Sequence, residues 1–319
     1  MSGPSKWVDA WNRYWFTPRS LIDLAVMRIV AVGLELFFLS TSWPVAGVAG
    51  EFARLHENTS IYHPISVLHL LTLPFGRDWM PPRFVLHAIF WISIATGIQS
   101  LIGFFTNRSL LVFSWSCLFI HSFRYSFGHV HNPDAITMFA LIALALSPCG
   151  GVLSVDAMRK DRRGFFDLEK KSQFAAWPIL FIQWMFVLFY ASAAFCKLRH
   201  GLAWANGYTL QWYLVQDALR WHLPAGMWLA GQHEIALLLS RVTLFFESTF
   251  ILVMFFPKLR WVYLPLGLGF HGAIFFFTAA PFFTFMALYS VFVPWTTVFE
   301  WIRAKVSPSG SPLRRQIAA

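Results

Sequence analysis

Eight stretches of about 20 residues are almost free of charged side chains, and they constrain the fold more than any other feature of the sequence. They run near residues 20–40, 84–104, 108–127, 133–150, 174–197, 234–256, 260–280 and 282–302. A helix crosses a bilayer core with about 20 mostly apolar residues, so each stretch predicts a membrane-spanning helix. The two longer connections, 41–83 and 198–233, are rich in Trp, Leu, His and Pro, which is typical of interfacial or re-entrant helices. We therefore predict an all-α, polytopic membrane bundle of about eight spans with interfacial helices.

The composition agrees with a membrane location. Hydrophobic residues make up 57% of the 319 residues and charged residues 13%, against roughly 25% charged residues in soluble domains. We expect a multi-pass protein of the cell membrane, of the bacterial inner-membrane type. One membrane domain is expected over residues 1–302 and a flexible cytoplasmic tail over residues 303–319. The three cysteines show no CxxC or Cys/His spacing, so neither a disulfide framework nor a metal site is expected.

The distribution of Lys and Arg predicts the orientation of the chain. Cytoplasmic loops retain basic residues, and an inside N-terminus places sixteen basic residues on the inner side and six on the outer side. Both termini and the 150–172 loop are therefore expected in the cytoplasm. The net charge of +10 is explained by the basic residues that set the orientation in the membrane, so no nucleic-acid partner is expected. The first 19 residues do not resemble a cleaved signal peptide, since tryptophans and basic residues are interspersed there, among them Trp7, Trp11, Trp15, Lys6 and Arg13.

In this orientation, unusual polar residues gather at the outer ends of the third and fifth predicted helices and in the turn GHVHNPD. They are His121, Arg124, Tyr125, His129, His131, Asn132, Asp134 and Lys197. Hydropathy alone does not require these residues to converge on one face of the membrane. Their convergence therefore predicts an outward-facing polar site. A local alternative stays open for Asn132-Pro133-Asp134, because Asn or Asp caps the first amides of a helix and Pro suits its first turn. The two nearby histidines are not needed for a cap, and they favour the functional interpretation.

Several ionisable residues lie inside the apolar stretches: Arg28, Glu35, Arg241, Glu247 and His271. An unpaired charge there costs about 2.5–3.5 kcal/mol on insertion scales. These side chains, together with that of Gln183, are expected to face the interior of the bundle. The structural interpretation is an ion pair, such as Arg28 with Glu35 or Arg241 with Glu247.

His271 lies in the stretch LGLGFHGAIFFF, between Gly267, Gly269 and Gly272. Glycines permit the close approach of a helix or a ligand, which favours a position in a pocket. A satisfied interior histidine remains the alternative.

Lys197 follows an apolar run and the small residues ASAA at the end of the fifth predicted span. One interpretation is an anchor, because a lysine at a helix end can extend its amine to the lipid headgroups. The other is a base, because partial burial favours the neutral amine near pH 7. The scarcity of basic residues on the outer side and the close helix packing that ASAA permits favour the base.

Three segments resemble the transmembrane domain of vitamin K-dependent gamma-carboxylases, that is, the horizontally transferred transmembrane (HTTM) domain. YASAAFCKLRHGLAWANGYTLQWYL is similar to the family segment in which a lysine closes an apolar helix and a Trp-x-x-Gly-Tyr follows. HNPDAITMFALIALALSPCGGVLSVDAM resembles the Asn-rich turn, apolar helix and Ser-Val-Asp ending of the family. FHGAIFFFTAAPFFTFMALYSVFVP is similar to the late helix that bears a histidine. The resemblance covers essentially the whole chain.

The resemblance implies an integral membrane enzyme that uses reduced vitamin K or another quinone, with O2 and CO2. It implies that Lys197 is the catalytic base, with His131 and Asp134 as catalytic partners near the position of the family's functional histidine. The cofactor-binding residues would be His271, Arg124, Asn132, Tyr190, Trp204, Gly269 and Gly272. The expected partners are membrane lipid, the quinone and a secreted peptide substrate. The alternative is a noncatalytic membrane partner for maturation, export or immunity of such a peptide.

Overall fold

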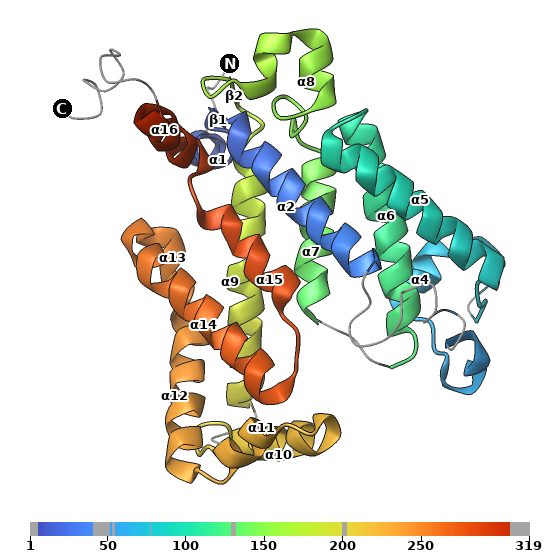
Figure 1. The fold of residues 1–319 in the computed structure, drawn as a ribbon, viewed down its shortest axis with the longest axis vertical. Coiled ribbons are helices and arrows are strands. Elements are labelled where there is room, and N and C mark those ends of the chain that lie inside the picture. Colours follow the sequence, from blue (N-terminus) through green and yellow to red (C-terminus); the bar gives the residue numbers. More distant parts are fainter. Residues whose placement is uncertain are drawn as a thin grey trace. The chain divides into compact units, whose positions relative to one another are not determined.

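The computed structural model describes residues 6–40, 52, 55–76, 78–128, 132–199 and 203–306. Helices form almost all of its regular structure (Figure 1), and two short strands, β1 (Arg19–Ser20) and β2 (Lys171–Ser172), pair antiparallel. The all-α prediction is confirmed. The chain divides into two compact units: unit 1 comprises Met1–Ile182 and Val293–Ala319, and unit 2 comprises Gln183–Phe292.

Four long helices form the centre of unit 1: α2 (Leu21–Ser40), α5 (Arg83–Ile102), α6 (Thr106–Tyr125) and α7 (Asn132–Ala145). Helix α6 packs on α5 and α7, and α2 packs on the same two helices, so each of the four contacts two others. Gly103 allows the tight turn between α5 and α6, because it adopts a left-handed φ of 72° that favours glycine. The shorter elements of unit 1 are α1 (Lys6–Trp15), α4 (Ser66–Leu71), α8 (Val155–Lys160), α16 (Trp295–Val306), η1 (Thr59–Ile61), η2 (Leu73–Phe75) and η3 (Arg162–Phe166).

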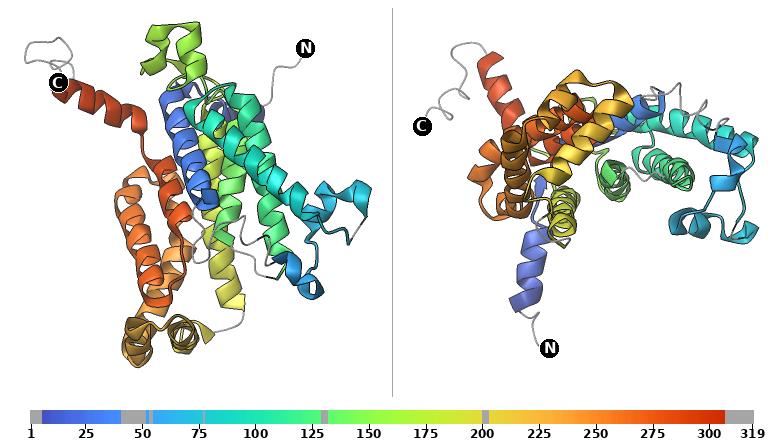
Figure 2. Two further views of the ribbon diagram at one scale, coloured as in Figure 1. Left: turned by 45° about the vertical axis from the view of Figure 1, so that its right-hand side comes forward. Right: turned by 90° about the horizontal axis from the view of Figure 1, so that it is seen from below.

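Helix α1 stands apart from the packed helices of unit 1. Its N-terminal end points away from them in Figure 2 (right), and none of its residues is buried. Apolar packing within the protein therefore does not hold this helix, although its sequence is strongly amphipathic.

Two charged side chains tie the segment after α7 to the long helices. Arg28 on α2 is buried and donates hydrogen bonds to the carbonyl oxygens of Cys149 and Leu153, at 3.3 and 2.5 Å. Asp156 accepts hydrogen bonds from the Thr106 amide and hydroxyl, both at 2.7 Å, and so caps the start of α6. Burial raises the pKa of Asp156, but these hydrogen bonds outweigh burial, and the pKa is lowered overall. The expected pairing of Arg28 with Glu35 is wrong, because both terminal nitrogens of the Arg28 guanidinium donate to backbone carbonyls and Glu35 contacts His121.

The last described helix of unit 1 returns to the start of α2. The Thr296 amide and hydroxyl donate to Asp23 Oδ1 at 3.1 and 3.3 Å, so a carboxylate of α2 caps the first turn of α16. Helix α16 continues to Val306, past the predicted domain boundary at residue 302. Residues 307–319 of the predicted tail lie outside the described residues.

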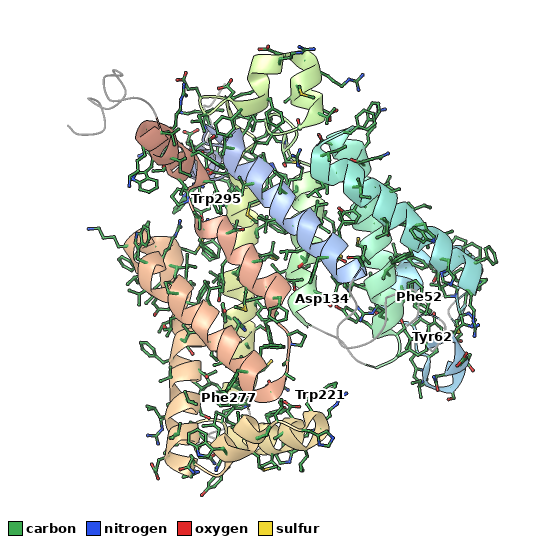
Figure 3. All side chains as sticks on the ribbon, viewed as in Figure 1. Phe52, Tyr62, Asp134, Trp221, Phe277 and Trp295 are labelled. Atoms are coloured by element: carbon green, nitrogen blue, oxygen red, sulfur yellow. The ribbon has the colours of Figure 1, made fainter. Side chains whose placement is uncertain are left out.

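Aromatic side chains dominate the packing of both units. In unit 1, Phe52 and Tyr62 (Figure 3) pack on Phe123 of α6, with ring centroids 5.8 and 6.1 Å apart. In unit 2, Tyr190 packs on Phe250 with centroids 4.4 Å apart, and Phe277 (Figure 3) packs on the small apolar core of α10 and α11. The helices of unit 2 are the rest of α9 (Ala176–Arg199), α10 (Tyr208–Trp221), α11 (Pro224–Ala230), α12 (His233–Thr249), α13 (Leu252–Phe255), η5 (Pro257–Leu259), α14 (Arg260–Thr278), α15 (Phe283–Leu288) and η6 (Tyr289–Phe292).

Within the described residues, three helices are long and apolar enough to cross a membrane: Arg83–Ile102, Ala176–Arg199 and Pro257–Thr278. The consecutive helices Phe283–Phe292 and Trp295–Val306 make a fourth if they count as one broken span. A membrane protein is compatible with this pattern, although the spans are fewer than the eight predicted. Helix α7 has 14 residues and α12 ends after 17, and α2 carries Asp23, Arg28 and Glu35. The remaining predicted stretches are therefore helical but shorter or more polar than typical spans.

Candidate functional site

Lys197 lies in the last turn of α9 and turns its amine toward α12. Its Nζ donates hydrogen bonds to both carboxylate oxygens of Glu247, each at 2.7 Å. The side chain of Glu247 is 5% exposed and that of Lys197 is 17% exposed. The Trp204 ring lies beside the same amine, with Nζ 5.1 Å from the ring centroid. The structure thus brings together the predicted base, one predicted cofactor-binding residue and a carboxylate.

Glu247 was expected to pair with Arg241, and that expectation is wrong. The exposed Arg241 side chain donates from Nε to the Ala205 carbonyl oxygen at 3.3 Å. Burying a charge costs free energy. In this pair each charge is compensated by the other, and both carboxylate oxygens accept a hydrogen bond, which offsets that cost. Glu247 is the partner that the sequence analysis missed for Lys197, and its position inside an apolar stretch was the signal for it.

A second group of polar atoms in unit 2 lies in its aromatic core. His271 Nε2 is 2.8 Å from the Tyr190 hydroxyl, which also contacts the Tyr289 hydroxyl. His271 Nδ1 is buried without a hydrogen-bond partner among the described residues.

The three glycines near His271 have different surroundings. Gly267 is where the chain approaches closely, because a Cβ there would overlap the Tyr289 hydroxyl. Nothing in the described residues lies within 4 Å of a Cβ added at Gly269 or Gly272, so these positions leave open space along α14. Of these three glycines, only Gly267 lies at a close contact, which is with Tyr289.

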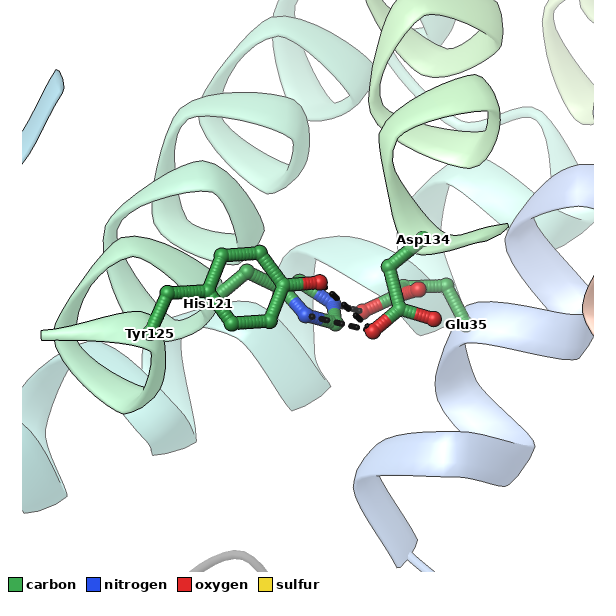
Figure 4. A network of polar contacts seen from close by, with 4 residues as sticks. All are labelled: Glu35, His121, Tyr125 and Asp134. Atoms are coloured by element: carbon green, nitrogen blue, oxygen red, sulfur yellow. Dashed lines mark hydrogen bonds and ion pairs between the residues drawn. The ribbon is translucent and has the colours of Figure 1, made fainter. Parts of the chain in front are cut away.

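Unit 1 contains its own buried cluster of ionisable side chains, drawn in Figure 4. His121 on α6 lies between two carboxylates, with Nε2 2.8 Å from Glu35 Oε1 of α2 and Nδ1 3.4 Å from Asp134 Oδ2 of α7. The Tyr125 hydroxyl donates to the same Asp134 oxygen at 2.7 Å. The side chains of His121 and Glu35 are 2% and 1% exposed. Three helices thus meet at this network.

The hydrogen bond between His121 and Glu35 is the short contact of this network. An ionised carboxylate only accepts hydrogen bonds, so this contact requires a proton on His121 Nε2 or on the Glu35 carboxyl group. His121 Nδ1 lies 3.4 Å from Asp134 and makes no hydrogen bond within the described residues. Beside the cluster, Phe38 stacks on His121, and the Arg124 guanidinium lies 4.8 Å from the Phe38 ring centroid. Arg124 thus places a positive charge at the edge of a network with two acids.

The predicted site residues fall into two groups. Lys197, Trp204, Tyr190, His271, Gly269 and Gly272 belong to unit 2, and Asp134, Arg124 and Asn132 belong to unit 1. That the two groups converge on one site stays a prediction, because they belong to different units. His131 lies outside the described residues, as does the side chain of Asn132. The sequence analysis placed His121, Tyr125 and Asp134 in one group, but it missed the contact of His121 with Glu35 on α2.

Comparisons of the chain with protein-family models, with curated proteins and with solved structures gave no match.

Proposed function

We propose that the chain is a membrane enzyme of the gamma-carboxylase type, with eight spans, cytoplasmic termini and a reduced quinone as cofactor. Lys197 is its base. The observation that carries the proposal is the position of the Lys197 amine, which is 2.7 Å from both oxygens of Glu247 inside unit 2. An amine that served only as a headgroup anchor would extend toward the water, whereas this one is held at a carboxylate that can exchange protons with it.

The protonation states of Lys197 and Glu247 determine when the pair can act as a base. In the ion pair, the ammonium carries the proton, and the pair as a whole is neutral. Once that proton passes to a water molecule at the partly exposed lysine, a neutral amine remains next to the Glu247 carboxylate, and its lone pair can accept a proton from an acidic hydroxyl. Glu247 then stabilises the ammonium that forms, which is the electrostatic part of general-base catalysis. A bound reduced quinone would supply that hydroxyl and, with O2, the stronger base needed to form a carbon–carbon bond with CO2.

The residues of unit 2 fit an aromatic, hydrogen-bonding cofactor. Ligand sites of this kind are mostly apolar, with a few polar groups that fix orientation. His271 Nδ1 is buried without a partner among the described residues, so it can bind a hydroxyl or carbonyl oxygen. The Trp204 ring lies beside the reacting amine, and Gly272, the residue after His271, leaves space along α14. Tyr190 would orient His271 through its hydrogen bond to Nε2.

Oxygen uptake by the purified protein with added vitamin K hydroquinone tests the base. Lys197→Arg keeps a cation for Glu247 but removes an amine that can be neutral near pH 7, so uptake should fall by about 100-fold or more. Lys258→Arg, the same change at the end of another helix, should leave uptake unchanged. Normal uptake in Lys197→Arg would contradict the assignment.

Lipid extraction tests the cofactor separately. Wild-type protein should retain a quinone through purification, as detected by mass spectrometry, and His271→Phe should retain less because it loses the Nδ1 contact. Equal retention by the two proteins would remove His271 from the site.

A noncatalytic partner for a secreted peptide is the second candidate function. The same ion pair favours it, because a bidentate lysine–carboxylate contact also ties α9 to α12 as a structural element. This function predicts no oxygen uptake by the wild type, and full complementation of a deletion strain by Lys197→Arg.

A further inference from the structure

The amphipathic helix at the start of unit 1 carries one aromatic face and one polar face. Successive residues of an α-helix are 100° apart, so Trp7, Trp11, Tyr14 and Trp15 fall on one side of α1. Lys6, Asp9, Asn12 and Arg13 fall on the other side. Trp7 is 85% exposed and Trp11 is 61% exposed, so the aromatic face is bare. Aromatic rings of this kind are enriched where lipid headgroups meet acyl chains.

An open groove of about 520 Å³ lies where α1 meets the segment before α9. Asn12, Arg13 and Thr17 line one side of it, and Gln173 lines the other. Phe16 and Phe174 meet edge to face across the groove, with ring centroids 6.4 Å apart, and give it an apolar wall. The groove therefore combines one guanidinium and several amide or hydroxyl groups with apolar surface.

The chain fixes the depth of this groove relative to a membrane. Phe174 comes two residues before Ala176, where the candidate span α9 begins, and Pro18 comes three residues before α2. The end of an apolar span lies at the boundary of the hydrocarbon core, so residues just outside it lie among the headgroups. Basic residues dominate this end of unit 1, since residues 155–172 carry six basic and four acidic side chains. This matches the negative surface of a cytoplasmic leaflet.

We propose that this groove binds the headgroup of an anionic phospholipid, with Arg13 as its charged contact. Helix α1 lies in the interface, its aromatic face toward the acyl chains. The groove's amide and hydroxyl groups bind the phosphate oxygens, and Phe16 and Phe174 contact the first carbons of the chains. The bare tryptophans, which nothing in the described part of the chain covers, are then buried in lipid.

Native mass spectrometry of the detergent-purified protein tests the headgroup site. The protein is incubated with equal amounts of phosphatidylglycerol and phosphatidylcholine that carry the same acyl chains. The wild type should retain phosphatidylglycerol in preference. Arg13→Gln should reduce that preference about fivefold, the usual effect of one basic residue at an anionic surface. Lys160→Gln, which removes the same charge from α8 outside the groove, should have no such effect. Equal effects of the two changes, or no effect of Arg13→Gln, would overturn the proposal.

A fluorescent label tests the position of α1 independently of that variant. An environment-sensitive dye is attached at Val8→Cys on the apolar face or at Asp9→Cys on the polar face, in a Cys196→Ser background that removes the exposed native thiol. In nanodiscs that contain phosphatidylglycerol, the dye at position 8 should emit as in an apolar medium and the dye at position 9 as in water. Water-like emission from both positions would show that α1 does not lie in the interface, and the proposal would fail.

Discussion

Removing either side chain of the Lys197–Glu247 pair is expected to destabilise the protein by several kcal/mol. Breaking a buried ion pair typically costs about 3–5 kcal/mol, because the remaining charge is left without compensation. The two halves should differ. Glu247 is 5% exposed, so Lys197→Met leaves an almost fully buried carboxylate unpaired and should cost about 5 kcal/mol. Lys197 is 17% exposed and can turn outward, so Glu247→Leu should cost about 3 kcal/mol.

The double variant isolates the interaction. With both charges replaced by apolar side chains of similar size, the position no longer contains an unpaired charge, so the loss should be within about 1 kcal/mol of wild type. The difference between the double variant and the sum of the single variants is the coupling energy. Reversible unfolding in mixed micelles of dodecyl maltoside and increasing SDS, followed by circular dichroism, gives all four free energies of unfolding.

Two results would refute this reasoning. Single variants that each cost less than about 1 kcal/mol would show that the pair behaves like an exposed surface pair. Additive losses in the double variant would show that the two side chains do not interact in the folded protein. Either result would also remove the structural support for Lys197 as a base positioned by Glu247.

Three further changes follow from other contacts. Glu35→Ala leaves buried His121 without its closest carboxylate and should cost about 3–5 kcal/mol, with a smaller loss for Glu35→Gln, as measured in the same unfolding assay. Gly267→Ala places a methyl group against the Tyr289 hydroxyl and should cost about 1–3 kcal/mol, which a normal unfolding midpoint would contradict. Asp156 has a lowered pKa in the folded state. Its contribution to the free energy of unfolding is therefore present above the unfolded pKa of about 4 and is lost as the pH falls through the folded pKa. The stability difference between wild type and Asp156→Asn should therefore shrink in acid, and a pH-independent difference would contradict this account.

Hydropathy located the helices well but not the partners of their charged residues. Glu35 is seven positions after Arg28, and Glu247 is six positions after Arg241, so the members of each expected pair are about 9–10.5 Å apart along a helix that rises 1.5 Å per residue. Only spacings of three or four bring side chains together on one helix. Each residue instead found a partner on another segment, as Glu35 did with His121 and Glu247 with Lys197. These contacts depend on how helices pack, which apolar periodicity does not encode.

The resemblance carried different information from the periodicity. It singled out Lys197 at a helix end where composition alone allowed an anchor, and the structure then placed a carboxylate at its amine. The group of His121, Tyr125 and Asp134 was predicted, but its individual contacts could not be, because Asn-Pro-Asp also has a sufficient explanation as a helix start. The acid is instead engaged by Tyr125, on the preceding helix, and by His121.

The contact between Asp23 and Thr296 can form only late in the synthesis of the chain. These residues are 273 positions apart, and unit 2 lies between them in the chain. A ribosome that adds about 5–20 residues per second needs roughly 15–55 s to pass from one to the other. Throughout that interval the first long helix exists without the donors that finally engage its carboxylate, while all of unit 2 is translated. Unit 1 is thus begun first and completed last, and a nascent chain arrested before Thr296 should be a better substrate for membrane quality-control proteases than one released just after it.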